Sequence, residues 1–380
     1  MKPKKSAAPA SPATEALDRF ATFFKERSAA HGIVGASLRV VGFDGPLRHV
    51  SFGLENRATA APVDEATIYH WASITKTLTG IAILQLRDRG KLSLDDPILQ
   101  YLPELSAVHN PFGPMNAITI RQILSHTAGF RAGTWPFGGD KDWHPFEPTD
   151  WSQLVAMLPY TEVEFAPGSK YSYSNPGIIY LGRVVEKISG EPWETYTDKN
   201  ILRPLGMTLS FFDRAPYHLV EDRSHSYSVS KGKMEEGRFD FDTGITVSNG
   251  GLNAPLGDME KYVRFLLGHA ETGIGARVLA RASIEEMWKP VALVETVGED
   301  RVDMGLCFFI ERRGKRRLIG HSGSQNGFIS HLYLDAAARA GYVVSFNTDA
   351  TEDVPVPNTR KLDAEVREFF VANVAPVLEA

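Results

Sequence analysis

Segments with the pattern of β-strands lie near both ends of this 380-residue chain, while helix-like segments fill its middle. Apolar, β-rich runs occupy residues 33–41 and 47–52, and such runs return at 304–311, 317–320, 329–335 and 342–347. Short turns between consecutive strands indicate antiparallel pairing. The amphipathic stretches 15–30 and 362–378 predict terminal helices that cover such a sheet. We therefore predict an α/β fold, in which N- and C-terminal helices flank an antiparallel sheet and a mostly helical lobe is inserted.

The same pattern divides the chain into a tail and two lobes. Residues 1–13 are rich in Lys, Ala, Pro and Ser, which predicts a flexible tail, with Thr14 as the cap of the first helix. Residues 14–90 and 251–380 are expected to form the α/β sandwich domain. Residues 91–250 are expected to form the mainly helical insertion with active-site loops. A pocket is expected at the seam between the two lobes.

Composition narrows the possible partners. The net charge is -5, so we expect neither nucleic acid nor a polybasic membrane patch as a partner. The sequence contains no run of 18 apolar residues, so we expect no transmembrane segment. The single cysteine, Cys307, lies in an apolar run and is expected in the core, which leaves no disulfide framework or zinc motif. Localisation stays open between the cytoplasm and, if a signal peptide was removed, the periplasm or exterior. Oligomeric state also stays open.

The tetrapeptide Ser73-Ile74-Thr75-Lys76 begins a segment that is apolar on most sides, which predicts a buried central helix from 73 to about 89. Ser73 and Lys76 are i and i+3 neighbours on one helix face. A serine hydroxyl needs an adjacent base to act as a nucleophile, and a lysine serves if burial depresses its pKa. By itself this short pattern more often describes an ordinary helix cap with an exposed lysine.

Two further motifs supply polar groups that suit such a site. In Tyr173-Ser174-Asn175-Pro176, the proline favours a helix start and places Tyr173 and Asn175 on the loop before it. Tyr173 can act as a general base and Asn175 can bind a substrate carbonyl.

The other motif is His321-Ser322-Gly323-Ser324, after the short strand 317–320. Gly323 permits a close backbone approach of a ligand. The Ser324 N–H can complete an oxyanion hole with the N–H of Ser73. His321 can donate to a substrate. In the loop 131–150, Trp135 and Trp143 are candidates to wall an acyl pocket.

Together, the three motifs resemble the serine β-lactamase and penicillin-recognising superfamily in its class C-like branch, which shares S-x-x-K, Y-x-N and K/H-x-G. Additional stretches are similar to that family: 124–129 (LSHTAG), 165–168 (FAPG), 204–207 (PLGM) and 250–252 (GGL). The resemblance implies Ser73 as the acylated nucleophile, with Lys76 and Tyr173 as its proton-transfer pair and Asn175 as polar support. It implies backbone oxyanion donors at Ser73 and Ser324, and no metal or other cofactor. His126, in the first of these stretches, is expected to make structural hydrogen bonds.

The third motif departs from the Lys-Thr-Gly usual in true β-lactamases. An unperturbed imidazole is mostly neutral at pH 7, so His321 argues against strong β-lactamase activity and is expected to gain charge toward pH 6. We therefore expect a carboxylesterase acting on small, short-acyl esters. The alternatives are a D-Ala-D-Ala carboxypeptidase or D-aminopeptidase, a weak β-lactamase acting on an amide or β-lactam, an acyltransferase, and a non-catalytic penicillin-binding sensor.

Overall fold

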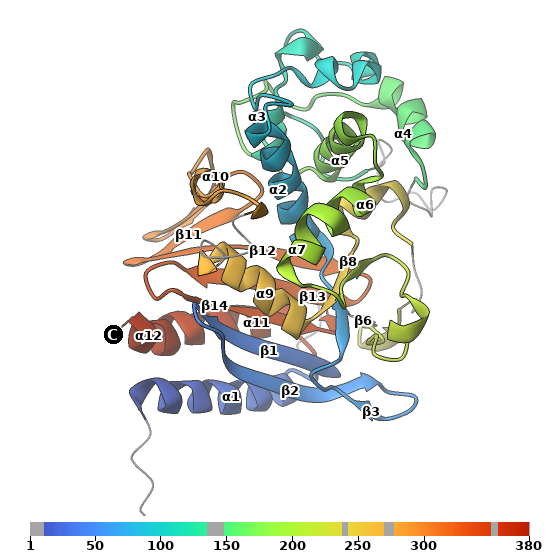
Figure 1. The fold of residues 1–380 in the computed structure, drawn as a ribbon. Helices are drawn as coiled ribbons and strands as arrows, with labels where there is room; N and C mark the ends of the chain where they lie inside the picture. The colour runs from blue at the N-terminus through green and yellow to red at the C-terminus, as the bar shows by residue number, and fades with distance from the viewer. Residues whose placement is uncertain (1–10, 135–147, 238–241, 270–276, 351–355, 380) are drawn as a thin grey trace, which may run out of the picture.

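A nine-stranded antiparallel sheet forms the centre of the molecule (Figure 1). The computed structural model describes residues 11–134, 148–237, 242–269, 277–350 and 356–379. In spatial order the strands are β3 (Ala61–Pro62), β2 (Pro46–Asn56), β1 (Gly35–Gly42), β14 (Ala340–Phe346), β13 (Phe328–Asp335), β12 (Arg316–Gln325), β11 (Phe309–Arg313), β10 (Asp300–Met304) and β9 (Ala292–Val297).

The two ends of the chain meet at the pairing of β1 with β14, where Ala36 lies opposite Phe346. Every residue of these two strands is buried. Most of their side chains are apolar because helices cover both faces of the sheet at this point. The predicted α/β architecture with an antiparallel sheet is confirmed.

One face of the sheet is covered by α1 (Pro12–Ala30), α11 (Thr359–Phe369) and α12 (Ala375–Glu379), as Figure 1 shows. We call this the outer face. Phe20, Phe24, Val366 and Phe370 are fully buried in the apolar layer between these helices and the strands. The cap of α1 differs from the expectation: Ser11, not Thr14, accepts the hydrogen bond, from the N–H of Thr14. The helix therefore begins at Pro12 and includes the last residues of the expected tail.

The opposite face carries α9 (Leu256–Leu266) and the helical lobe, whose centre is α2 (Thr75–Asp88). We call this the inner face. All residues of α2 from Thr75 to Leu86 are buried, which confirms the expected central helix. The other helices of this side are α3 (Ile120–Leu124), α4 (Trp151–Met157), α5 (Asn175–Ser189), α6 (Trp193–Thr197), α7 (Arg203–Leu205), α8 (Val247–Gly250) and α10 (Arg281–Met287). The expected boundaries of the inserted lobe stay a prediction.

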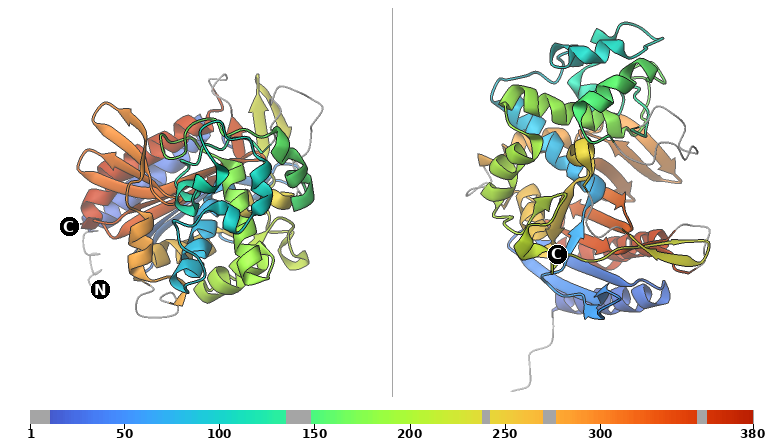
Figure 2. Two further views of the ribbon diagram at one scale, coloured as in Figure 1. Left: turned by 90° about the horizontal axis from the view of Figure 1, so that it is seen from above. Right: turned by 90° about the vertical axis from the view of Figure 1, so that its right-hand side faces the viewer.

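Two small three-stranded sheets accompany the main sheet. Figure 2 shows the whole molecule from above and from its right-hand side. One of the small sheets consists of β4 (Ile68–His70), β8 (Leu252–Pro255) and β5 (Phe211–Phe212), and the other of β15 (Thr348–Ala350), β6 (Tyr227–Ser230) and β7 (Lys233–Glu236). β4 leads directly into the turn that precedes α2, so this small sheet positions the start of the central helix. In the described ranges, no helix has the length and apolar character needed to cross a membrane.

Candidate active site

Ser73 lies in a short 3-10 turn, Ala72–Ile74, between β4 and α2, rather than in the first turn of the α-helix itself. The backbone of Ala72 has a φ of 47°, in the left-handed region that non-glycine residues rarely adopt. The turn is held against the sheet because the Ser330 hydroxyl donates a hydrogen bond to the Trp71 carbonyl at 3.0 Å. Ser73 is the partly exposed residue in this otherwise buried segment.

Lys76 is fully buried and directed at Ser73. Its Nζ donates one hydrogen bond to Ser73 Oγ at 2.9 Å and another to the Asn249 carbonyl at 2.9 Å. Burial lowers the pKa of Lys76 to about 7, because the ammonium loses the water that would stabilise its charge. An amine with this pKa is available in its free-base form near neutral pH.

Tyr173 also lies close to Lys76, whose Nζ is 5.0 Å from the centre of the phenol ring. Burial raises the pKa of Tyr173 far above its usual value, and a hydrogen bond with Ser73 only partly opposes this. The phenol is therefore neutral at rest. Of the two groups beside Ser73, Lys76 is the one whose protonation state changes near pH 7.

Asn175 lies in a helix, whereas we expected it on a loop. It is the first residue of α5, and Ser174 caps the helix by accepting a hydrogen bond from the N–H of Gly177. The N–H of Asn175 donates to the Ala132 carbonyl at 3.1 Å, which ties the helix start to the preceding loop.

The third motif lies inside β12 rather than after a short strand. Strand β11 pairs with β12 only as far as Gly320, so residues 321–325 pair with β13 alone and their other edge faces the lobe. Gly323 is needed there because a Cβ would collide with the Trp71 carbonyl oxygen. The missing side chain of Gly323 thus leaves room for the turn that carries Ser73. We had expected it to leave room for a ligand. The exposed Ser324 donates from Oγ to Asp349 at 3.4 Å.

His321 is buried beside Tyr173, with their ring centres 6.2 Å apart. Burial, assisted by the nearby Lys76, lowers the pKa of His321 to about 3. Its Nδ1 lies 2.6 Å from the Ser322 carbonyl, so Nδ1 carries the proton and donates. The expectation that His321 gains charge toward pH 6 is wrong, because the imidazole is cut off from solvent.

Two contacts of the site were missed from the sequence. The carbonyl of Asn249, in α8, is the second acceptor for Lys76. His126 stacks on Tyr173 with ring centres 4.6 Å apart. The only signals were two of the family-like stretches, one adjoining Asn249 and one containing His126. Trp135 and Trp143 lie outside the described residues.

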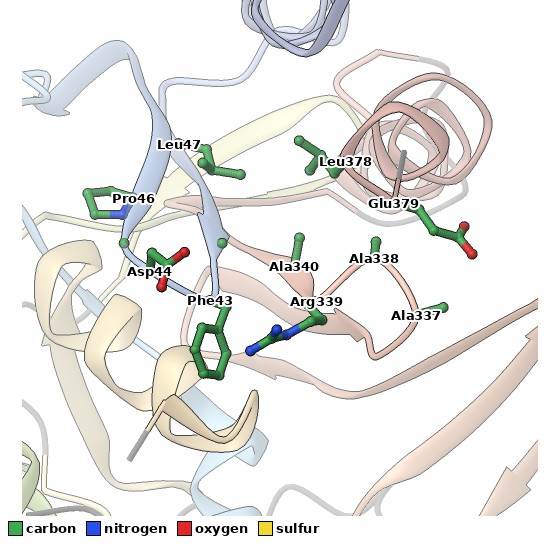
Figure 3. A pocket seen from close by; sticks show the side chains of 12 residues that line it. Phe43, Asp44, Pro46, Leu47, Ala337, Ala338, Arg339, Ala340, Leu378 and Glu379 are labelled. Carbon is green, nitrogen blue, oxygen red and sulfur yellow. The ribbon is translucent and has the colours of Figure 1, made fainter. Parts of the chain in front are cut away.

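A surface pocket of about 610 Å³ lies far from this cluster. Figure 3 shows it between the β1–β2 turn and the β13–β14 turn, with Arg339 reaching over Phe43, 3.7 Å from its ring centre. Strand register puts these turns, around Gly42 and Ala340, at the opposite end of the strands from Gly323. This pocket is therefore separate from the Ser73 cluster.

The profile of the Beta-lactamase family matches residues 20–366. The chain belongs to this family. Class C beta-lactamase structures and a penicillin-binding protein of Bacillus subtilis are among the proteins that the chain resembles. A class C beta-lactamase structure covers 97% of the chain, and the chain covers 99% of it, at 20% identity and a TM-score of 0.77. At this identity the likeness supports the fold.

Sequence relatives of this family member carry several activities in their names. Esterase EstB of Burkholderia gladioli is 31% identical over 216 residues, which are 53% of this chain and 54% of EstB. Protein flp of Staphylococcus aureus (strain COL) is 24% identical over 323 residues, or 85% of this chain and 61% of flp. Penicillin-binding protein 4* of Bacillus subtilis is 25% identical over 329 residues, or 83% of this chain and 68% of its own length. The chain thus spans just over half to two thirds of these relatives.

Proposed function

We propose that the protein is a carboxylesterase that forms an acyl-enzyme on Ser73 and prefers esters with short acyl groups. The observation that carries the proposal is the 2.9 Å contact between Ser73 Oγ and the buried Nζ of Lys76. Because burial holds the pKa of Lys76 near 7, a free amine stands beside the hydroxyl at neutral pH. Such a pair satisfies the requirement for an activated serine nucleophile.

In the proposed acylation, Ser73 Oγ attacks the ester carbonyl carbon and its proton passes to Nζ of Lys76. The carbonyl oxygen gains the negative charge and is stabilised by the N–H groups of Ser73 and Ser324. The free edge of β12 beyond Gly320 suits this role for Ser324. The carbon–oxygen bond to the alcohol then breaks, and the alkoxide takes a proton from Lys76 through the neutral hydroxyl of Tyr173. Asn175 would orient the acyl carbonyl from the start of α5.

Deacylation reverses these roles. A water molecule gives its proton to the Tyr173–Lys76 pair and attacks the acyl carbon, and Ser73 Oγ leaves and recovers the proton. The same two residues thus serve as base and acid in turn. No step requires a metal or an organic cofactor.

An ester is preferred over a β-lactam because the third motif supplies no cation. His321 is neutral at all pH values where Lys76 is a working base, since its pKa is lowered to about 3. A substrate carboxylate therefore finds no charged partner there, whereas a neutral ester loses nothing. The likeness to esterase EstB agrees with this choice.

The test is a substrate panel that compares kcat/KM for p-nitrophenyl acetate, a D-Ala-D-Ala peptide and a chromogenic cephalosporin. We expect the ester to be the best substrate. Ser73→Ala should lower its hydrolysis by roughly 10⁴-fold or more with the fold intact, as for other serine nucleophiles. A fluorophosphonate should add its mass to Ser73 in the wild type and to nothing in Ser73→Ala. Labelling of Ser322, or faster cleavage of the peptide or cephalosporin, would overturn the proposal.

A further inference from the structure

His126 makes a set of contacts with the segment that carries Tyr173. Its carbonyl accepts a hydrogen bond from the N–H of Ser172 at 2.9 Å. Its Nδ1 accepts one from the N–H of Ser174 at 3.1 Å. Its ring lies against the phenol of Tyr173, with centres 4.6 Å apart and planes inclined by 28°. One residue therefore holds the tyrosine from both chain neighbours and from one face of its ring.

These contacts define the chemical form of His126. Because Nδ1 accepts from a backbone N–H, it carries no proton, so the neutral ring has its proton on Nε2. The ring is only 2% exposed. Within the described part of the chain, Nε2 has no hydrogen-bond partner. A buried donor left without a partner is costly, and such costs are tolerated where a side chain serves a function.

Hydrogen bonds fix the backbone on both sides of His126. Helix α3 starts with a capping box between Thr119 and Gln122. The N–H of Thr127 then donates to the Gln122 carbonyl at 2.8 Å. His126 itself has a φ of 55°, so the chain turns sharply there and directs the imidazole toward Tyr173. The phenol of Tyr173 also lies 5.0 Å from Nζ of Lys76, measured from the ring centre.

We propose that His126 is a positioning residue that sets the place of the Tyr173 hydroxyl relative to Ser73 and Lys76. The neutral imidazole supports one face of the phenol, and the clamp on Ser172 and Ser174 fixes the backbone to either side. Proton relay through Tyr173 depends on this placement, because an error of about 1 Å in a reacting group can cost up to 100-fold in rate. This inference rests on the proposed role of Tyr173.

The test uses three substitutions of His126 in the full-length chain, with p-nitrophenyl acetate as substrate. His126→Ala removes both the ring and the acceptor, His126→Phe keeps a ring, and His126→Asn keeps an acceptor. Each preparation is titrated to completion with a fluorophosphonate, so that kcat is expressed per reactive Ser73. We expect His126→Ala to lower this kcat by about 10- to 100-fold with little change in KM. The Asn and Phe variants should each recover part of the loss.

Ser125→Ala is the matched control. Ser125 is buried in the same turn, and within the described residues its hydroxyl bonds to the Arg121 and Gln122 carbonyls and the Thr127 hydroxyl. This substitution should change the amount of active protein but not kcat per site. In the Tyr173→Phe background, which lacks the hydroxyl, His126→Ala should cause almost no further loss. An additive loss in that double mutant would overturn the inference, as would an unchanged kcat per titrated site. If Tyr173→Phe alone retains full activity, the proposed function of Tyr173 fails instead.

Discussion

Two clusters on opposite sides of the central sheet differ in what surrounds their buried ionisable groups. On the outer face, the imidazole of His331 lies 2.6 Å from the carboxylate of Asp363 in α11, and both side chains are nearly buried. On the inner face, Lys76, His126 and His321 are buried without any carboxylate among their hydrogen-bond and ion-pair partners in the described ranges. The outer-face imidazole thus lies against a carboxylate, whereas these three groups do not. Burial away from water lowers the pKa of Lys76 and of His321.

This contrast separates stability from reactivity. The contact between His331 in β13 and Asp363 helps to hold α11 on the sheet. An uncompensated lysine destabilises the folded protein in its charged form and is therefore ready to act as a base. A nucleophilic site requires groups with shifted pKa values around an accessible serine, and the inner face has them around Ser73. The groups described above on the outer face include no such arrangement.

The largest expected effect comes from removing the proton-transfer groups beside Ser73. Lys76→Met and Tyr173→Phe should each lower kcat by about 10²- to 10⁴-fold, the range for loss of general acid–base help. The double mutant should be little worse than the worse single mutant, because the two groups share one proton transfer. Steady-state kinetics with an aryl ester measures this. Multiplicative losses would show that the two residues act independently.

The pH dependence of the wild type should report the depressed pKa of Lys76. The free amine is the active form, so kcat/KM should fall about tenfold per unit as pH drops below 7 and level off above it. The measurement is an aryl-ester profile from pH 5 to 9, corrected for spontaneous hydrolysis. A limb still rising at pH 9 would mean that burial does not depress this lysine.

Stability should respond in opposite directions on the two faces. Lys76→Met should raise the free energy of unfolding by on the order of 1 kcal/mol or more at pH 6, because it removes a buried charge without a counter-ion. The charged-lysine penalty is present below the folded-state pKa of about 7 and is relieved as pH rises toward the unfolded value of 10.5. The gain should therefore shrink between pH 6 and pH 9.

Asp363→Ala is the outer-face counterpart. It removes the carboxylate that lies against His331 and should lower the free energy of unfolding by on the order of 1 kcal/mol, with kcat per active site unchanged. Urea denaturation of both variants at pH 6 and pH 9 measures the contrast. Destabilisation by Lys76→Met at pH 6, or a lower kcat in Asp363→Ala, would remove the distinction between the faces.

The smallest expected effect concerns selectivity at His321. His321→Lys adds a potential cation beside the substrate and should lower the ratio of esterase to β-lactamase kcat/KM several-fold, equivalent to about 1 kcal/mol for one charge pair. In the wild type, lowering the pH from 7.5 to 6 should leave this ratio unchanged, because His321 remains neutral. A ratio that falls on acidification would show that solvent reaches the imidazole.

Much of the fold could be predicted from the sequence because strands and helices depend on local residue patterns. The apolar runs at both ends predicted strands that the structure places side by side as β1 and β14. The all-round apolar character of α2 predicted its burial. Boundaries were less accurate where short-range hydrogen bonds decide them. Ser11 rather than Thr14 caps α1, and β12 extends through the third motif instead of ending at Gly320.

For the site, the sequence by itself determined which chemical groups are available: a serine and a lysine three residues apart, a tyrosine before a proline-started helix, and a histidine two residues before a glycine. These follow from residue identity and helical spacing, which need no knowledge of the fold. Only the tertiary structure decided the state of those groups. Whether Lys76 and His321 are neutral depends on how much water and countercharge surround them, and segments far apart in the chain supply that environment. The same is true of His126, whose stacking on Tyr173 joins residues 47 positions apart and leaves no trace in either local pattern.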